Sequence, residues 1–155
     1  MKLYESIATE PVTQLAIREP VLSPPSETVA DAVRRMRAKD LGCVIVVDDD
    51  RRPLGYFTES MLTQLLVNDP SALDDPISIR MSEQCPIVRE ADLVSKVLKS
   101  MQTENTRFLG VVDAQGRVTG LTGQKGLMEY IADHFPQQVL VQRVGSGPLK
   151  EREGA

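Results

Sequence analysis

The sequence predicts an α/β fold of the α+β type, in which one 155-residue chain holds two β-α-β-β-α repeats. Three observations predict it. The chain matches itself at an offset of 65 residues, each copy contains two short strands joined by a turn, and helical apolar patterns flank both hairpins. This length suits one domain, or two halves that share a core.

The repeat needs no gap when residues 12–66 are laid on residues 77–131. It gives eight identities in 55 positions, whereas random pairing gives about three. The identical pairs are Val29 with Val94, Met36 with Met101, Val46 with Val111, Val47 with Val112, Asp48 with Asp113, Arg52 with Arg117, Gly55 with Gly120 and Leu62 with Leu127.

The first repeat opens with an extended segment at Pro20–Ser23, because its prolines disfavour a helix. Thr28 is the predicted N-cap of the helix that follows, with Asp31 at capping-box spacing. Cys43–Val47 reads as a buried strand, because it is a continuous apolar run rich in β-branched residues. A turn over 48–53, a second strand at Leu54–Thr58 and a helix carrying Leu62, Leu65 and Leu66 complete the unit.

The same order of strands and helices is predicted for the second repeat. Pro86–Val88 is extended, Asp92 is the predicted N-cap, and Phe108–Val112 and Val118–Thr122 are the paired strands. The closing helix carries Leu127, Tyr130 and Ile131. The predicted boundaries are an N-terminal segment 1–11, repeats at 12–67 and 77–135, a turn-rich linker 68–76, and a C-terminal strand and tail 136–155, with the strand at 139–141.

Composition excludes several classes of function. Aromatic residues make up 4% of the chain and the formal charge is −4, so neither base stacking nor phosphate-backbone binding is expected. No apolar run approaches the length of a membrane span, and the N-terminus lacks the apolar region of a secretory signal. Cys43 and Cys85 fit neither a CxxC motif nor a disulfide framework, which indicates a cytoplasmic protein with reduced thiols.

No group of residues predicts an enzyme. Asp31 is explained by helix capping, and Asp48-Asp49-Asp50 lacks the spacing of a calcium loop. His134 lies near a helix C-terminus, where a cation is favourable, so no metal site is expected.

The ordered set of motifs resembles the CBS domain, named after cystathionine β-synthase. The resemblance is carried by Thr28-Val29-x-Asp31-Ala32, Val44-x-Val46-Val47-Asp48 and Leu54-Gly55-Tyr56-Phe57-Thr58-x-Ser60, and it recurs in the second copy. It implies a tandem pair, or Bateman module, whose sheets pack together with pseudo-twofold symmetry and leave two equivalent clefts. One unit of about 55 residues is marginal alone, so burying its sheet against a copy is the expected source of stability.

The resemblance also implies ligand-binding positions after the second strand of each repeat, where a hydroxyl and helix N-terminal amides meet a phosphate or ribose. Thr58 matches the hydroxyl position and Ser60 adds another, but Met61 stands where a ribose-binding Asp is expected. Glu59 is expected to point away on its helix. The extended segments and strand starts are expected to line the clefts, through Val21, Leu22, Cys43, Gly55, Ile87, Phe108 and Gly120.

In the second repeat Gly123 replaces the Thr or Ser, and Gly126 replaces the Asp. Thr122 lies one position early. Arg107, Lys125 and the glycine-rich backbone form a candidate anion site, and the alternative is that both cations are solvated surface charges. Cys43 is interpreted first as a small buried hydrophobic residue, and Cys85 as a residue beside the cleft.

The predicted function is therefore a regulatory sensor, with no catalytic residue. It would bind AMP, ADP, ATP or S-adenosylmethionine between the repeats as a regulatory ligand, with no cofactor required, and would control a protein partner. A homodimer is expected from the resemblance, and neither nucleic acid nor membrane is an expected partner. The alternative is a ligand-free dimerisation or interaction module, because neither repeat keeps the full signature.

Overall fold

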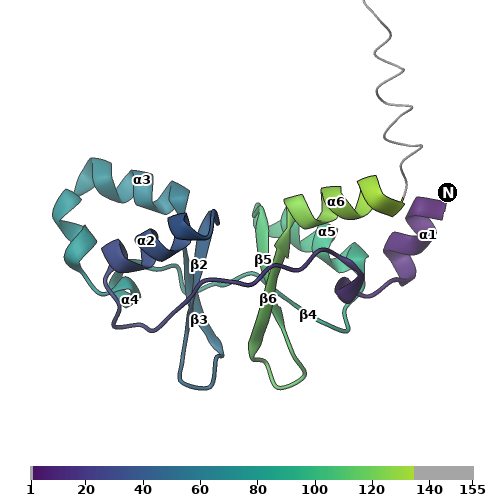
Figure 1. Cartoon of the computed structure of the whole chain (residues 1–155), viewed down its shortest axis with the longest axis horizontal. Helices are drawn as coiled ribbons and strands as arrows, with labels where there is room; N and C mark the ends of the chain where they lie inside the picture. Colours follow the sequence, from purple (N-terminus) through teal and green to yellow (C-terminus); the bar gives the residue numbers. More distant parts are fainter. Residues whose placement is uncertain (1, 135–155) are drawn as a thin grey trace, which may run out of the picture.

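The computed structural model describes residues 2–134 and contains two three-stranded sheets placed face to face, each flanked by helices (Figure 1). The first repeat has the predicted order β-α-β-β-α. Its elements are β1 (Leu22–Ser23), α2 (Val29–Ala38), β2 (Cys43–Val47), β3 (Pro53–Thr58) and α3 (Glu59–Asn68).

The second repeat has the same order, which confirms the predicted fold class. Its elements are β4 (Ile87–Arg89), α5 (Val94–Glu104), β5 (Phe108–Val112), β6 (Val118–Gly123) and α6 (Gln124–His134). The predicted strand at 139–141 and the tail lie outside the described residues.

The two sheets have matching topology. In each, the short first strand runs parallel to the central strand, which pairs antiparallel with the third. Each central strand carries an irregularity at the same place, between Val46 and Val47 and between Val111 and Val112. Both hairpins therefore have one geometry, as the repeat in the sequence implies.

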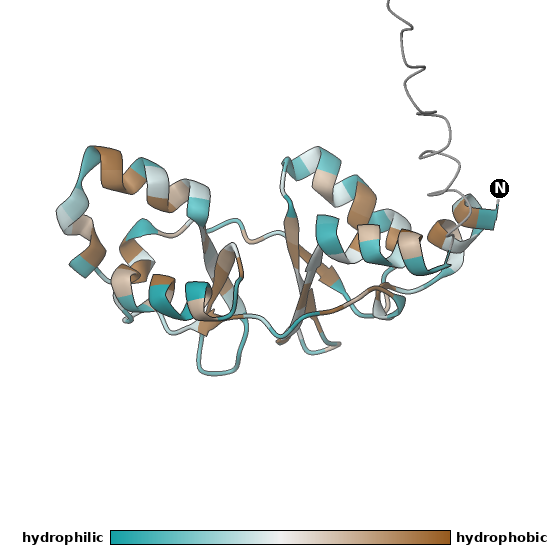
Figure 2. Ribbon diagram, turned by 45° about the horizontal axis from the view of Figure 1, so that its top comes forward, coloured by the Kyte–Doolittle hydropathy of each residue, from teal (hydrophilic) through white to brown (hydrophobic). Residues whose placement is uncertain are grey.

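The core is aliphatic and continuous between the sheets. All five residues of β2 are buried, and Val112, Val118 and Leu121 of the second repeat belong to the same core cluster. Ile45 reaches across to Gly110, where an added Cβ would lie 3.1 Å from the Ile45 Cδ1 atom. Hydropathy colouring shows the apolar residues concentrated on the facing strands and on the inner sides of the helices (Figure 2).

The segment that leads into each repeat, with the first residues of that repeat, packs on the other repeat. Val12, in the 3₁₀ helix η1 (Val12–Gln14), is buried in the second repeat, and its amide donates to the Asp92 carbonyl at 2.7 Å. Ile77, in α4 (Ile77–Arg80), is buried in the first repeat, and its amide donates to the Glu27 carbonyl at 2.7 Å.

We call the two leading segments, residues 2–18 and 70–82, the exchanged segments. They contain two further helices that the sequence patterns did not predict. Helix α1 (Lys2–Thr9) contacts α5 of the second repeat, and the 3₁₀ helix η2 (Pro70–Asp74) contacts α2 and α3 of the first. Residues 68–76 are thus not a plain turn-rich linker, because Ala72 is buried against the first repeat.

One predicted helix cap is confirmed and one is wrong. The Thr28 hydroxyl accepts the Asp31 amide at 3.2 Å and caps α2. Leu93, rather than Asp92, is the N-cap residue of α5, and the Asp92 carboxylate instead accepts the Arg89 amide and the Lys96 ammonium. Within residues 2–134 no helix is long and apolar enough to cross a membrane.

Candidate functional site

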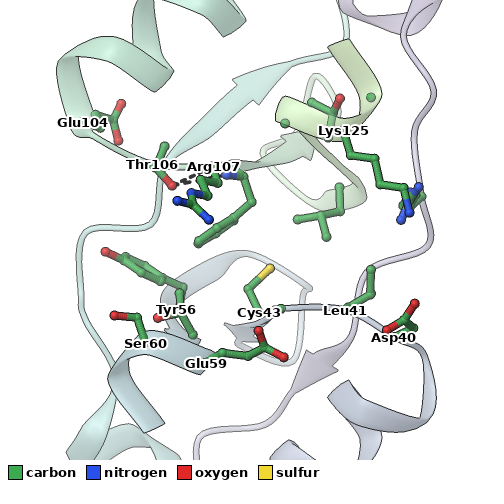
Figure 3. A pocket seen from close by; sticks show the side chains of 18 of the residues that line it. Asp40, Leu41, Cys43, Tyr56, Glu59, Ser60, Glu104, Thr106, Arg107 and Lys125 are labelled. Atoms are coloured by element: carbon green, nitrogen blue, oxygen red, sulfur yellow. Dashed lines mark hydrogen bonds between the residues drawn. The ribbon is translucent and has the colours of Figure 1, made fainter. Parts of the chain in front are cut away.

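One continuous cleft of about 860 Å³ lies between the repeats and is lined by equivalent segments of both (Figure 3). Two of its walls are the strand-to-helix junctions β3–α3 and β6–α6. The other two are the loops that lead into β2 and β5. Where the resemblance implies two equivalent clefts, the structure has one cavity that equivalent segments of both repeats line.

Nine of the fourteen predicted site residues line this cleft. They come from the starts of β2 and β5, the two junctions, and the loop before β5. They are Cys43, Thr58, Ser60, Met61, Arg107, Phe108, Thr122, Gly123 and Lys125.

The other five predicted residues lie elsewhere. Val21 and Leu22 line a second cleft of about 590 Å³ beside β1, and Ile87 lies on the edge strand β4. Gly55 and Gly120 lie beneath the exchanged segments. A Cβ on Gly55 would meet the Ser82 carbonyl at 2.5 Å, and one on Gly120 would meet Ile17 at 2.2 Å. Neither glycine lines the cleft, and both permit close packing.

Thr58 is the N-cap residue of α3 at the wall of the cleft. Its hydroxyl accepts the Met61 amide at 3.2 Å and so caps α3, which leaves the hydroxyl hydrogen available as a donor. Ser60 is exposed beside it in the first turn of the same helix. The junction can therefore offer two hydroxyl groups to a ligand.

The matching junction of the second repeat is built on close backbone contacts. A Cβ on Gly123 would meet the Arg107 carbonyl at 2.2 Å, and one on Gly126 would meet the Ala16 carbonyl at 2.7 Å. The exchanged segment thus occupies the space that an Asp at position 126 would need. Thr122 lies below Gly126, and among the described residues its hydroxyl is the one buried side-chain oxygen without a hydrogen-bond partner.

Acidic residues of the cleft were missed by reasoning from the sequence. Asp40, Glu59 and Glu104 line it together with Arg107 and Lys125. The expectation that Glu59 points away is wrong. Its amide donates to the Gly42 carbonyl at 3.1 Å, which turns the start of α3 toward the loop before β2 and brings the carboxylate over Gly42 and Cys43 (Figure 3).

Two aromatic rings meet across the repeats in this cleft. Tyr56 of β3 and Phe108 of β5 form an edge-to-face pair with centroids 5.3 Å apart. Both rings are half-buried and line the cavity. They offer an apolar surface to a planar ligand ring, although the chain is poor in aromatic residues.

The two thiols near the cleft, Cys43 and Cys85, have raised pKa values. Burial raises the pKa of Cys43 to about 12, and Cys85 and Glu59 add to the rise. Burial also raises the pKa of Cys85 to about 12, with a smaller contribution from Glu104. Both thiols are therefore protonated at neutral pH and are poor nucleophiles. Among the described residues, no cluster of three or more His, Cys, Asp or Glu side chains could hold a metal ion.

Comparison with known proteins identifies the repeat. The family model for the CBS domain matches residues 12–68 and residues 76–133. An uncharacterized protein of Methanopyrus kandleri is 27% identical over 119 residues, which cover 76% of this chain. The match spans 61% of that protein, so this chain corresponds to less than two thirds of its length.

Solved structures share the architecture at low identity. A putative acetoin utilization protein from Vibrio cholerae superposes with a TM-score of 0.71 at 21% identity, over 84% of this chain and 96% of that chain. The CBS domain pair of protein MJ0100, in complex with 5′-methylthioadenosine and S-adenosylmethionine, gives a TM-score of 0.69 at 17% identity, over 79% and 94% of the two chains.

Proposed function

Because the chain belongs to the CBS domain family, we propose that it is a regulatory module that binds an adenosyl ligand in the cleft between its repeats and controls a protein partner. The observation that carries the proposal is the cleft itself, which equivalent segments of both repeats line. A ligand there touches both halves, so it favours whichever arrangement of the halves it binds better.

The chemistry of the cleft supports an adenosyl ligand. The Tyr56–Phe108 pair offers an aromatic surface for a base, Thr58 and Ser60 offer hydroxyl donors for a ribose, and Lys125 stands in the first turn of α6. Its volume, about 860 Å³, lies in the range of small-molecule sites. MJ0100, which shares the fold, was solved with two adenosyl compounds bound.

Isothermal titration with AMP, ADP, ATP and S-adenosylmethionine tests the proposal. We expect saturable binding of at least one of them, and weaker binding in Thr58→Ala and Lys125→Ala if their ends of the cleft are used. Flat titrations with all four ligands at millimolar concentration would overturn the proposal. Unchanged affinity in both variants would refute the assignment of the site.

We propose no catalytic residue and no required cofactor, because CBS-domain pairs are generally regulatory modules. We also propose a cytoplasmic location, which the two free thiols among the described residues support. The homodimer expected from the resemblance is supported by the exposed apolar residues Leu66 and Val67 on α3.

A second candidate is a ligand-free interaction module. It is favoured by Met61 and by Gly126, which stand where a ribose-binding carboxylate was expected, and by the exposed apolar surface of α3. This module would be a stable dimer whose melting temperature does not change when nucleotides are added. A ligand that binds only the native state would raise that temperature. A thermal-shift screen therefore separates the two candidates.

A further inference from the structure

The cleft carries both signs of charge in equal number. Among its lining residues Asp40, Glu59 and Glu104 are acidic, and Arg18, Arg107 and Lys125 are basic. The Arg18 guanidinium is already paired with Glu129 at 3.1 Å. Within residues 2–134 no ion pair involves the other five, so three free carboxylates face two free cations. The free charge of the cavity is slightly negative.

Each side of the cavity carries one acid and one base (Figure 3). Glu104 and Arg107 lie on one side, Lys125 and Asp40 lie on the other, and the Glu59 carboxylate lies between them beside Cys43 (Figure 3). A ligand that spans the cavity therefore meets a carboxylate and a cation on each side. A chain of phosphates that spans it meets three free carboxylates as well as two free cations.

The two helix N-termini that end in the cleft differ in charge. Helix α3 begins with Glu59, whose carboxylate neutralises the positive end of that helix. Helix α6 has no acidic residue in its first turn and carries Lys125 there. The α6 end thus favours an anionic group, and the α3 end, next to the Tyr56 and Phe108 rings, favours a neutral or cationic one.

We infer that the cleft selects an adenosyl ligand whose 5′ substituent is neutral or carries both charges, such as a thioether or an amino-acid sulfonium, over a nucleoside polyphosphate, and that Glu59 is a specificity-determining residue. This inference rests on the proposed function, because it concerns the ligand of the same cleft. A carboxylate of the ligand would lie toward Lys125 and α6. Its cationic or apolar atoms would lie toward Glu59, beside the base on the ring pair.

Competitive and direct titrations with S-adenosylmethionine, 5′-methylthioadenosine and ATP test the inference. The wild-type chain should bind each of the first two more tightly than ATP by about tenfold or more, the ratio that about 1.4 kcal/mol gives. Glu59→Gln should reduce this preference by about two- to fivefold, the effect of about 0.4–1 kcal/mol from one exposed charge. Higher salt should reduce the preference too, because exposed charges are screened.

Glu5→Gln is the matched control, because Glu5 is an exposed residue of α1 that does not line the cleft. It should leave the preference unchanged. Tighter binding of ATP than of the other two ligands, or an unchanged preference in Glu59→Gln, would overturn the inference and leave the proposed function standing. Failure of all three ligands, and of AMP and ADP, would overturn both.

Discussion

The two repeats have a glycine at the same position because another segment packs closely there. Gly55 and Gly120 align in the sequence, and each lies under the segment that crosses from the other half of the molecule. The main chain pairs there as well, because Tyr56 exchanges hydrogen bonds with Ser82, and Leu121 does so with Arg18. The sequence pattern marked these glycines as important but could not show that a backbone segment, rather than a ligand, approaches them.

Replacing Gly120 with Ala should destabilise the protein by about 1–3 kcal/mol, the usual cost of overpacking. The new Cβ would lie 2.2 Å from the Ile17 side chain, so the exchanged segment must move. Urea unfolding followed by circular dichroism measures the loss.

Gly42→Ala is the control for this substitution. Its Cβ would meet only the Glu59 carboxyl group, at an ordinary 3.6 Å. We expect no loss of stability, since Gly→Ala at an unstrained position restricts the unfolded chain. Equal midpoints for the two variants would contradict this account of Gly120.

The direction of the Glu59 side chain could not be predicted from local spacing in the sequence. Helical spacing from Met61 predicted the direction of its side chain, but Glu59 is the first residue of α3 and follows a cap with extended backbone. Its direction depends on the contact with Gly42, a residue 17 positions earlier in the sequence. No local pattern contains that contact.

At the scale of elements, the hairpins are the best-predicted parts of the fold. In both, an Asp after the central strand accepts two amides of the turn: Asp48 from Asp50 and Arg52, and Asp113 from Gln115 and Arg117. The turn then needs a residue at positive φ. Gly116 fills this place in one hairpin and Arg51 in the other.

The pKa of Asp113 is lowered, chiefly by the hydrogen bond from the Arg117 amide, which outweighs the opposing effect of burial. A carboxylate with a lowered folded-state pKa stabilises the fold above its unfolded pKa of about 3.9, and this contribution is lost as the pH falls. Asp113→Asn should therefore reduce the dependence of the unfolding free energy on pH between about 5 and 2.

Thermal unfolding of both proteins across that pH range measures the difference. Asp74→Asn serves as the control, because Asp74 is exposed and belongs to η2 rather than to a hairpin. The interpretation is wrong if the wild type and Asp113→Asn lose stability in parallel.

The closing helices α3 and α6 differ in how deeply they are buried. Helix α6 buries Leu127 and Tyr130, and the Tyr130 hydroxyl donates to Glu10 of the exchanged N-terminal segment. Helix α3 buries no residue fully, although its apolar pattern matches. The sequence predicted both helices, but it could not show how well each is covered, because their coverage comes from non-equivalent segments. Val12 and Leu15 of the N-terminal segment share a core cluster with α6, whereas η2 contacts α3.

At the scale of the whole molecule, the exchanged segments make the two repeats one cooperative unit. Ile77 lies at the start of the second repeat in sequence and is fully buried in the core of the first. The self-match of the sequence identified the symmetry and therefore the architecture. It could not decide which half each leading segment joins, since both halves offer equivalent surfaces.

Ile77→Ala should lower the free energy of unfolding by about 2–5 kcal/mol, because it leaves a cavity in the core. Unfolding should remain a single transition, since the exchanged segments connect both halves. Differential scanning calorimetry measures both properties.

Ile79→Ala is the matched control, because Ile79 belongs to the same short helix and is 66% exposed. It should change the stability by no more than about 0.5 kcal/mol. Similar losses in both variants, or two separate transitions in Ile77→Ala, would refute this view of the fold.

The exchange also affects how the chain must fold as it leaves the ribosome. Val12 and Leu15 are made early, but their core partners Leu127 and Tyr130 are made more than a hundred residues later. At about 5–20 residues per second, that interval is roughly 6–23 s. During it the native surface that covers the N-terminal segment is incomplete. In a nascent chain the core of the second repeat is therefore completed last, when α6 emerges and covers residues made at least 112 positions before it.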